Sequence, residues 1–155
     1  MTSPDDNRGF AAADDPADML QSEPARIRFV DYRSRRSPNG IVFVEVELAR
    51  IDGDRVVGSA SGQPSAVGDL RIAAEAAISA LRQAVASGQR FEIAGVKTVR
   101  AFDATVVLVS VIELTDPTAK RLLGSAFATG EDGAAAVRAV LNATNRVLCR
   151  PRAGG

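Results

Sequence analysis

The chain has 155 residues, 46% hydrophobic and 25% charged, and its 19 basic and 19 acidic residues give no formal net charge. This length and apolar content predict one globular domain with a hydrophobic core. With no histidine and a single cysteine, the sequence excludes an intrachain disulfide, the usual zinc sites and any catalytic triad that needs an imidazole base.

The two ends of the chain differ in composition from the rest. Residues 1–24 hold six acidic residues and one base, Arg8, in a stretch rich in Asp, Ala, Pro and Ser. Such a stretch cannot bury enough apolar surface to offset the entropy of ordering, so we expect a disordered acidic tail there and a flexible end at 151–155. Because neither a secretory signal nor a membrane-length apolar run is present, we expect a cytoplasmic protein without membrane association.

The first half of the remaining chain predicts three strands and a helix. A short strand at 26–33 is followed by a Ser-Pro-Asn-Gly turn and by a strand at 41–50 with one fully apolar face. The Asp-Gly pair at 52–53 predicts a tight hairpin with a returning strand. Apolar residues then recur every three or four positions, which predicts a helix with Asp69 as its N-cap.

The same pattern then restarts in the second half. A strand or a bent pair of strands at 90–102 leads to a long strand, its return and a second helix headed by Asp132. The Gly-Ser-Ala at 58–60 recurs at 124–126. We interpret this as an internal duplication: an α+β fold of two pseudo-symmetric βββα repeats, with antiparallel sheets and one helix packed on each. The predicted domain covers 25–150, divided into units 25–88 and 89–150, since one unit is too small to be stable alone.

The long strand of the second unit is apolar on both faces. Val106, Leu108 and Ile112 share one face, and the alternating positions between them hold further valines. A sheet covered by a helix on one side exposes its other side as an apolar patch. We expect the face carrying Val107, Val109 and Val111 to be buried against the sister unit or a second copy of the chain.

Three short motifs carry a family resemblance: Ser-Gly-Gln-Pro at 61–64, Leu-Leu-Gly-Ser-Ala-Phe at 122–127 and Leu-Asn-Ala-Thr-Asn-Arg at 141–146. Within two βββα units, they resemble the C-terminal regulatory and dimerisation domain of 2-isopropylmalate synthase and citramalate synthase. The resemblance spans about residues 26–148 and lacks the catalytic barrel. It implies a homodimer that binds an amino-acid-like metabolite near its interface, with a separate enzyme or regulator protein as a further partner.

Small residues supply the candidate ligand site. They let a ligand approach backbone amides near a helix N-terminus, where an anion is favoured; the alternative is that small residues are needed where a strand passes under a helix. The candidate ligand-binding residues are Gly58, Ser59, Gly62, Pro64, Gly124, Ser125 and Ala126.

An alternative function rests on a run of arginines near the start of the folded part. Such a run, with aromatic residues among its members, is typical of nucleic-acid or phosphate binding, although the balanced net charge disfavours nucleic acid. The candidate residues are Arg26, Arg28, Arg33, Arg35 and Arg36.

No catalytic residue, metal-ligand set or cofactor is predicted. The serines of the Gly-Ser-Ala motifs have no base partner, and Glu45 and Glu47 are interpreted as the solvated face of a strand rather than an acid–base pair. We therefore expect a non-catalytic, stand-alone regulatory or dimerisation module.

Overall fold

The structure is a computed structural model that describes residues 26–65, 68–85, 89–114 and 119–148. The predicted acidic tail, the predicted flexible end and the predicted unit limits at 25, 88 and 150 lie outside the described residues. Within them, two antiparallel three-stranded sheets are each followed by a helix. This confirms the predicted α+β fold with two βββα units.

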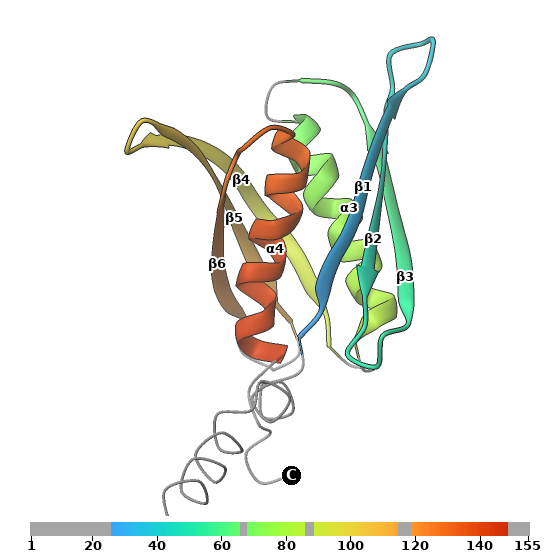
Figure 1. Ribbon diagram of the computed structural model, residues 1–155, viewed down its shortest axis with the longest axis vertical. Helices are drawn as coiled ribbons and strands as arrows, with labels where there is room; N and C mark the ends of the chain where they lie inside the picture. The colour runs from blue at the N-terminus through green and yellow to red at the C-terminus, as the bar shows by residue number, and fades with distance from the viewer. Residues whose placement is uncertain (1–25, 66–67, 86–88, 115–118, 149–155) are drawn as a thin grey trace, which may run out of the picture.

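Each unit has the same order of elements. Sheet A contains β1 (Arg28–Arg36), β2 (Val42–Ala49) and β3 (Arg55–Gly62), followed by α3 (Gly68–Ala84). Sheet B contains β4 (Phe91–Ala101), β5 (Ala104–Glu113) and β6 (Lys120–Phe127), followed by α4 (Asp132–Leu148). The two helices lie side by side between the sheets (Figure 1). Each sheet therefore has an inner face on the helices and an outer face directed away from them.

The central strands supply most of the inner faces. Val44, Val46 and Leu48 of β2 are at most 1% exposed, and Val107, Val109 and Val111 of β5 are fully buried. The prediction for β5 was wrong about which face needs a partner. The three valines pack on helix α4 of their own unit, so the outer face of β5 is the one that carries Val106, Leu108 and Ile112.

Glycine and alanine allow each helix to lie very close to the last strand of its sheet. A Cβ added to Gly58 would overlap the backbone of Ala76 and Ala80 in α3, and one added to Gly124 would overlap Ala139 and Ala143 in α4. These four alanines are fully buried. The alanine content of the helices therefore has a packing role, because a larger side chain would hold helix and sheet apart.

The two units also match in an irregular detail. The register of β1 with β2 shifts between Phe29 and Asp31, and that of β4 with β5 shifts between Ile93 and Gly95. Such β-bulges bend a strand, so the segment at 90–102 is one bent strand rather than two. The shifts align Phe29 with Ile93, and the glycine contacts align Ala76 with Ala139.

Each helix also bonds the beginning of the other unit. The side-chain amide of Asn145 in α4 accepts a hydrogen bond from the Ile27 N–H (3.1 Å) and donates one to the Ile27 carbonyl (3.0 Å). In the reverse direction, the Arg71 guanidinium of α3 donates to the Ile93 carbonyl of β4 (3.4 Å). The two units are thus completed by each other, as the small size of one unit requires.

The start of α3 differs from the prediction. Ser65, rather than Asp69, caps the helix, because its hydroxyl accepts a hydrogen bond from the Gly68 N–H (2.7 Å). Asp69 lies in the first turn, where its carboxylate accepts from the Ser65 N–H (3.3 Å). This reciprocal arrangement is a variant of the capping box.

Candidate functional site

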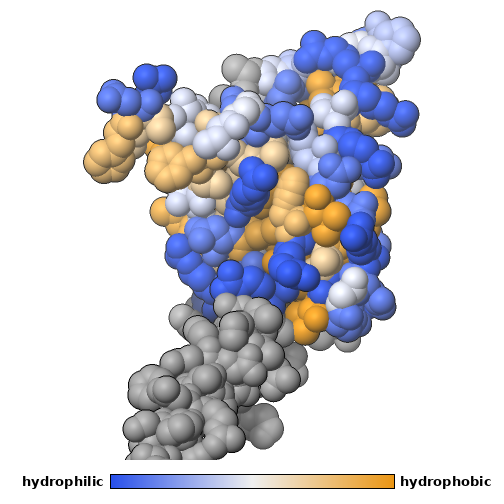
Figure 2. Space-filling model, in the orientation of Figure 1, coloured by the Kyte–Doolittle hydropathy of each residue, from blue (hydrophilic) through white to orange (hydrophobic). Residues whose placement is uncertain are grey.

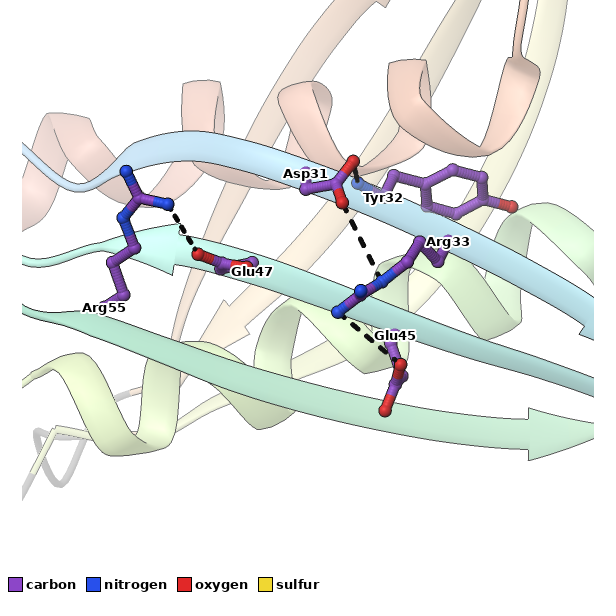
Figure 3. A network of polar contacts seen from close by, with 6 residues as sticks. All are labelled: Asp31, Tyr32, Arg33, Glu45, Glu47 and Arg55. Carbon is purple, nitrogen blue, oxygen red and sulfur yellow. Dashed lines mark hydrogen bonds and ion pairs between the residues drawn. The ribbon is translucent and has the colours of Figure 1, made fainter.

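The outer face of sheet A carries alternating charges. Asp31 and Arg33 project from β1 on this face, because they pair in register with Glu47 and Glu45 of β2. Arg33 lies 3.8 Å from the Asp31 carboxylate and 3.7 Å from that of Glu45, while Arg55 of β3 contacts Glu47 at 3.0 Å (Figure 3). Both glutamates lie on this outer face, but only Glu45 is well solvated, since the Glu47 side chain is 19% exposed.

A shallow cavity of about 660 Å³ opens on this face; we call it the sheet A trough. Arg33 and Arg35 supply positive charge, Glu45 negative charge and Phe43 an aromatic ring, over which the Arg35 guanidinium lies at 5.6 Å. Groups of both signs beside an apolar surface complement a zwitterion with an apolar side chain. The other residues that line the trough are Ser34, Val44, Ser59, Ala60 and Ser61.

The structure does not bring the predicted ligand-binding residues together. Residues 58–64 belong to the first unit and 124–126 to the second, with both helices between the two sheets. Of the first group, Ser59 lines the trough, whereas an added Cβ at Gly62 would press on Ile72 of α3. Pro64 is half-buried just after β3.

In the second group of predicted ligand-binding residues, Gly124 and Ser125 contact α4. Gly124 lies under the helix, and the Ser125 N–H donates a hydrogen bond to the Asn142 side chain (3.1 Å). Ala126 is half-buried on the inner face of sheet B. Packing therefore accounts for Gly58 and Gly124, while the ligand-binding role of all seven residues stays a prediction.

The predicted arginine cluster is divided among three places. Arg33 and Arg35 line the trough, and Arg36 lies 3.8 Å from the Asp69 carboxylate at the start of α3. Arg26 and Arg28 lie at the other end of β1, beside α4. Alternation directs Arg36, which pairs with the buried Val42, away from the face that carries Arg33 and Arg35, whereas the length of β1 separates Arg26 and Arg28 from the other three arginines.

Tyr32 occupies a third position, where both helices begin. It lines a cavity of about 560 Å³ with Asp69, Glu131 and Asp132, and it lies so close to Gly133 that a Cβ there would overlap its ring. Burial raises the pKa of the Tyr32 phenol; a hydrogen bond from Ser34 opposes this, and the nearby Glu131 and Asp69 add to it. The phenol therefore stays protonated above its usual pH range.

This shift predicts a loss of stability in alkaline solution. Between the ordinary tyrosine pKa of 10.0 and the higher value in the folded chain, the unfolded state loses its proton while the native state retains it. The free energy of unfolding should therefore fall as the pH rises through this window. Tyr32 is the only tyrosine, so ultraviolet absorbance of the phenolate, measured with and without denaturant, reports both pKa values. Equal values in the two states would contradict the prediction, and Tyr32→Phe should remove this pH dependence.

The outer face of sheet B is more apolar than that of sheet A, although polar and charged side chains also lie on it. Leu123 and Phe127 of β6 are 54% and 56% exposed and lie beside Val106, Leu108 and Ile112 of β5. Figure 2 shows apolar side chains beside hydrophilic ones on the β4–β5 hairpin at this side of the molecule. The sequence interpretation missed this surface because it assigned the outward position to the wrong face of β5.

The tip of the β4–β5 hairpin was also missed. Phe102 and Asp103 both have positive φ, 54° and 60°, and the Phe102 side chain is 96% exposed. Two left-handed residues between antiparallel strands make the type I′ turn, for which Asn-Gly is the usual sequence. Phe-Asp carries no such signal.

Two further observations concern metal ligands and membrane-spanning helices. Within the described ranges, no three His, Cys, Asp or Glu side chains gather closely enough to hold a metal ion. None of the helices that the structure describes combines the length and apolarity needed to span a lipid bilayer.

A scan against models of protein families finds no match for this sequence, and a search of curated proteins finds no relative.

Proposed function

We propose that this chain is a non-catalytic dimerisation and regulatory module, in which two copies associate through the outer faces of their B sheets. The observation that carries this proposal is the apolar surface formed by Val106, Leu108, Ile112, Leu123 and Phe127. A twofold dimer places the same patch of both copies in contact. Interfaces of this type resemble a hydrophobic core cut in half.

The expected gain per side chain is substantial. Completely burying one exposed Leu or Phe side chain contributes about 1.5–3 kcal/mol, so the half-exposed Leu123 and Phe127 each contribute a fraction of this, twice in a symmetric dimer. The charged side chains on this outer face, Glu92, Lys97 and Arg121, belong to the outer strands or the end of the patch. Ser110 and Ser125 lie among the apolar side chains, so the patch combines apolar and hydroxyl groups, with the charges on its outer strands and at its end.

Light scattering after size-exclusion chromatography tests the proposal. We expect the wild-type chain to be a dimer at micromolar concentration, and Leu123→Glu to weaken the dimer by about a hundredfold, because a charge would be buried without a partner. Val57→Glu is the matched control. Val57 precedes Gly58 as Leu123 precedes Gly124, and it is 43% exposed on the outer face of sheet A. A monomeric wild type, or equal disruption by both variants, would contradict the proposal.

We also propose a site for a small metabolite on the same module. We place an amino-acid-like ligand in the sheet A trough, where its carboxylate would pair with Arg33 or Arg35, its ammonium with Glu45 and its apolar side chain with Phe43. This site lies on the opposite outer face from the proposed interface, so communication between them would pass through the helix layer. Isothermal titration with apolar amino acids tests this part independently. Loss of binding in Arg35→Ala would support it, and no binding to wild type would rule it out.

A further inference from the structure

A separate cavity of about 520 Å³ lies between the start of sheet A and helix α4. We call it the arginine cavity, because four arginines line it: Arg26 and Arg28 from the first unit, and Arg138 and Arg146 from α4. Asn142 and Asn145 add polar groups, and no carboxylate of the described residues lines the cavity. All four guanidinium groups belong to exposed residues, so an ion in solvent can reach them.

The cavity is built by fixed contacts. The two hydrogen bonds between Asn145 and Ile27 hold the beginning of sheet A against α4. The Arg138 guanidinium lies over the Phe29 ring at 4.9 Å, and Arg146 donates a hydrogen bond to the Asn142 side chain at 3.3 Å. Among the described residues, none of the four arginines forms an ion pair with a carboxylate. Their charges are therefore uncompensated within this part of the chain.

The duplication provides an internal comparison. The corresponding groove between α3 and β4 has about the same volume, 500 Å³, and is lined by two arginines, Arg71 and Arg82, and two glutamates, Glu75 and Glu92. When the two units are aligned, Glu75 occupies the position equivalent to Arg138, and Glu92 occupies the position equivalent to Arg28. Both acidic positions of one groove are thus arginines in the other. The fold itself does not require this charge, since the sister groove has the same architecture with balanced charges.

Four neighbouring positive groups without counter-charges repel one another, and this repulsion is relieved when an anion binds. Guanidinium groups match phosphate oxygens with two parallel hydrogen bonds each. We propose that the arginine cavity is a binding site for a small anion of the phosphate class that carries two or more negative charges. This site is distinct from the sheet A trough and from the apolar face of sheet B, and it does not depend on the function proposed for them.

Isothermal titration of the full chain with pyrophosphate tests the proposal. We expect saturable binding of one pyrophosphate per chain that weakens as sodium chloride is added, since the interaction is electrostatic. Arg138→Glu restores the charge found in the sister groove and should weaken binding by at least about tenfold. Arg82→Glu makes the same change in net charge within the sister groove and should leave the affinity within about twofold. A thermal melt of each variant shows whether it is folded.

Two outcomes would overturn the proposed anion site. Equal weakening by Arg138→Glu and Arg82→Glu would show a general charge effect and overturn the assigned site. An affinity for single-stranded oligonucleotides that rises steadily with their length, without pyrophosphate competition, would mean that a nucleic acid is the occupant and overturn the small-anion proposal.

The acidic residues 1–24 could compete for the cavity, so one more variant is needed. If wild type binds no pyrophosphate, the titration is repeated on the full chain with its six N-terminal acids changed to the corresponding amides. Binding by this variant that is lost again on adding Arg138→Glu would support the site. No binding by either protein would overturn it. Comparing pyrophosphate with a nucleoside diphosphate then distinguishes a free phosphate from a phosphate carried by a larger metabolite.

Discussion

Replacing Gly124 with alanine is expected to lower the free energy of unfolding by about 3 kcal/mol. The added Cβ would overlap the carbonyl of Ala139 and the amide of Ala143, and these are helix backbone atoms that cannot move aside as a flexible side chain can. The helix as a whole would have to shift from the sheet, opening space around Val109 and its neighbours. Urea denaturation followed by circular dichroism measures the loss.

Gly95→Ala is the matched control for this substitution. Gly95 is also a strand glycine of sheet B, but nothing lies within 4 Å of an added Cβ there and its φ is not positive. Alanine at this position should leave stability unchanged or raise it by about 0.5 kcal/mol, because the unfolded chain loses freedom. Equal effects of the two substitutions would contradict the close approach of α4 to β6. Packing would then no longer explain the recurrence of the motif around Gly124 in the two repeats, and ligand binding would become the better interpretation of this motif.

Asn145→Leu is expected to destabilise the fold by about 2 kcal/mol. The substitution removes a donor and an acceptor at once, and it leaves the N–H and the carbonyl of Ile27 without the partners that join the units. Ile27 is 3% exposed, so water has poor access to replace both bonds. The same denaturation experiment gives the loss directly.

Asn142→Leu serves as the comparison for the Asn145 variant. Asn142 is one turn earlier on α4 and accepts a hydrogen bond from the Ser125 N–H, but this bond is exposed to solvent. We expect a loss of at most about 1 kcal/mol, since water can replace an exposed partner. A larger loss of stability for Asn142→Leu than for Asn145→Leu would contradict this prediction. It would mean that the bonds between Asn145 and Ile27 stabilise the fold less than the bond between Asn142 and Ser125 does.

The sequence was sufficient to predict the class and repeat of the fold, because the signals that determine them are local. Alternating Val and Glu at 42–48 fixes the inner face of β2, and the Asp-Gly pair at 52–53 fixes its hairpin. The recurring Gly-Ser-Ala motif marked the duplication because each copy performs the same packing role under a helix.

The buried and exposed faces of β5 could not be assigned from the sequence, because both faces are apolar. Such a strand lacks the alternation of polar and apolar residues that normally identifies the buried face. The turn at Phe102 and Asp103 lacks the residues that usually announce it, and its positive φ values are imposed by the two strands that it joins. The Ser65 cap was missed for a related reason. Serine and aspartate are both good capping residues, and only the position of the first helical turn decides between them.

The arginine cavity lies still further from what sequence reasoning can reach. The linear cluster at 26–36 extends along the whole of β1, and its first two members line a cavity with arginines more than a hundred positions later. Arg138 belongs to no motif, Arg146 only ends the Leu-Asn-Ala-Thr-Asn-Arg segment, and both look like the solvated side of an amphipathic helix. A comparison of the two repeats position by position would have found the signal, as Glu75 in one helix corresponds to Arg138 in the other.

The contact between Ile27 and Asn145 also concerns the connectivity of the chain. It brings the first and last described elements together, so the two ends of the folded part are neighbours in space. Proteins with adjacent ends often accept circular permutation. A gene rewritten to encode the second unit before the first would preserve every contact within and between the units, and would make the covalent order of the two halves interchangeable.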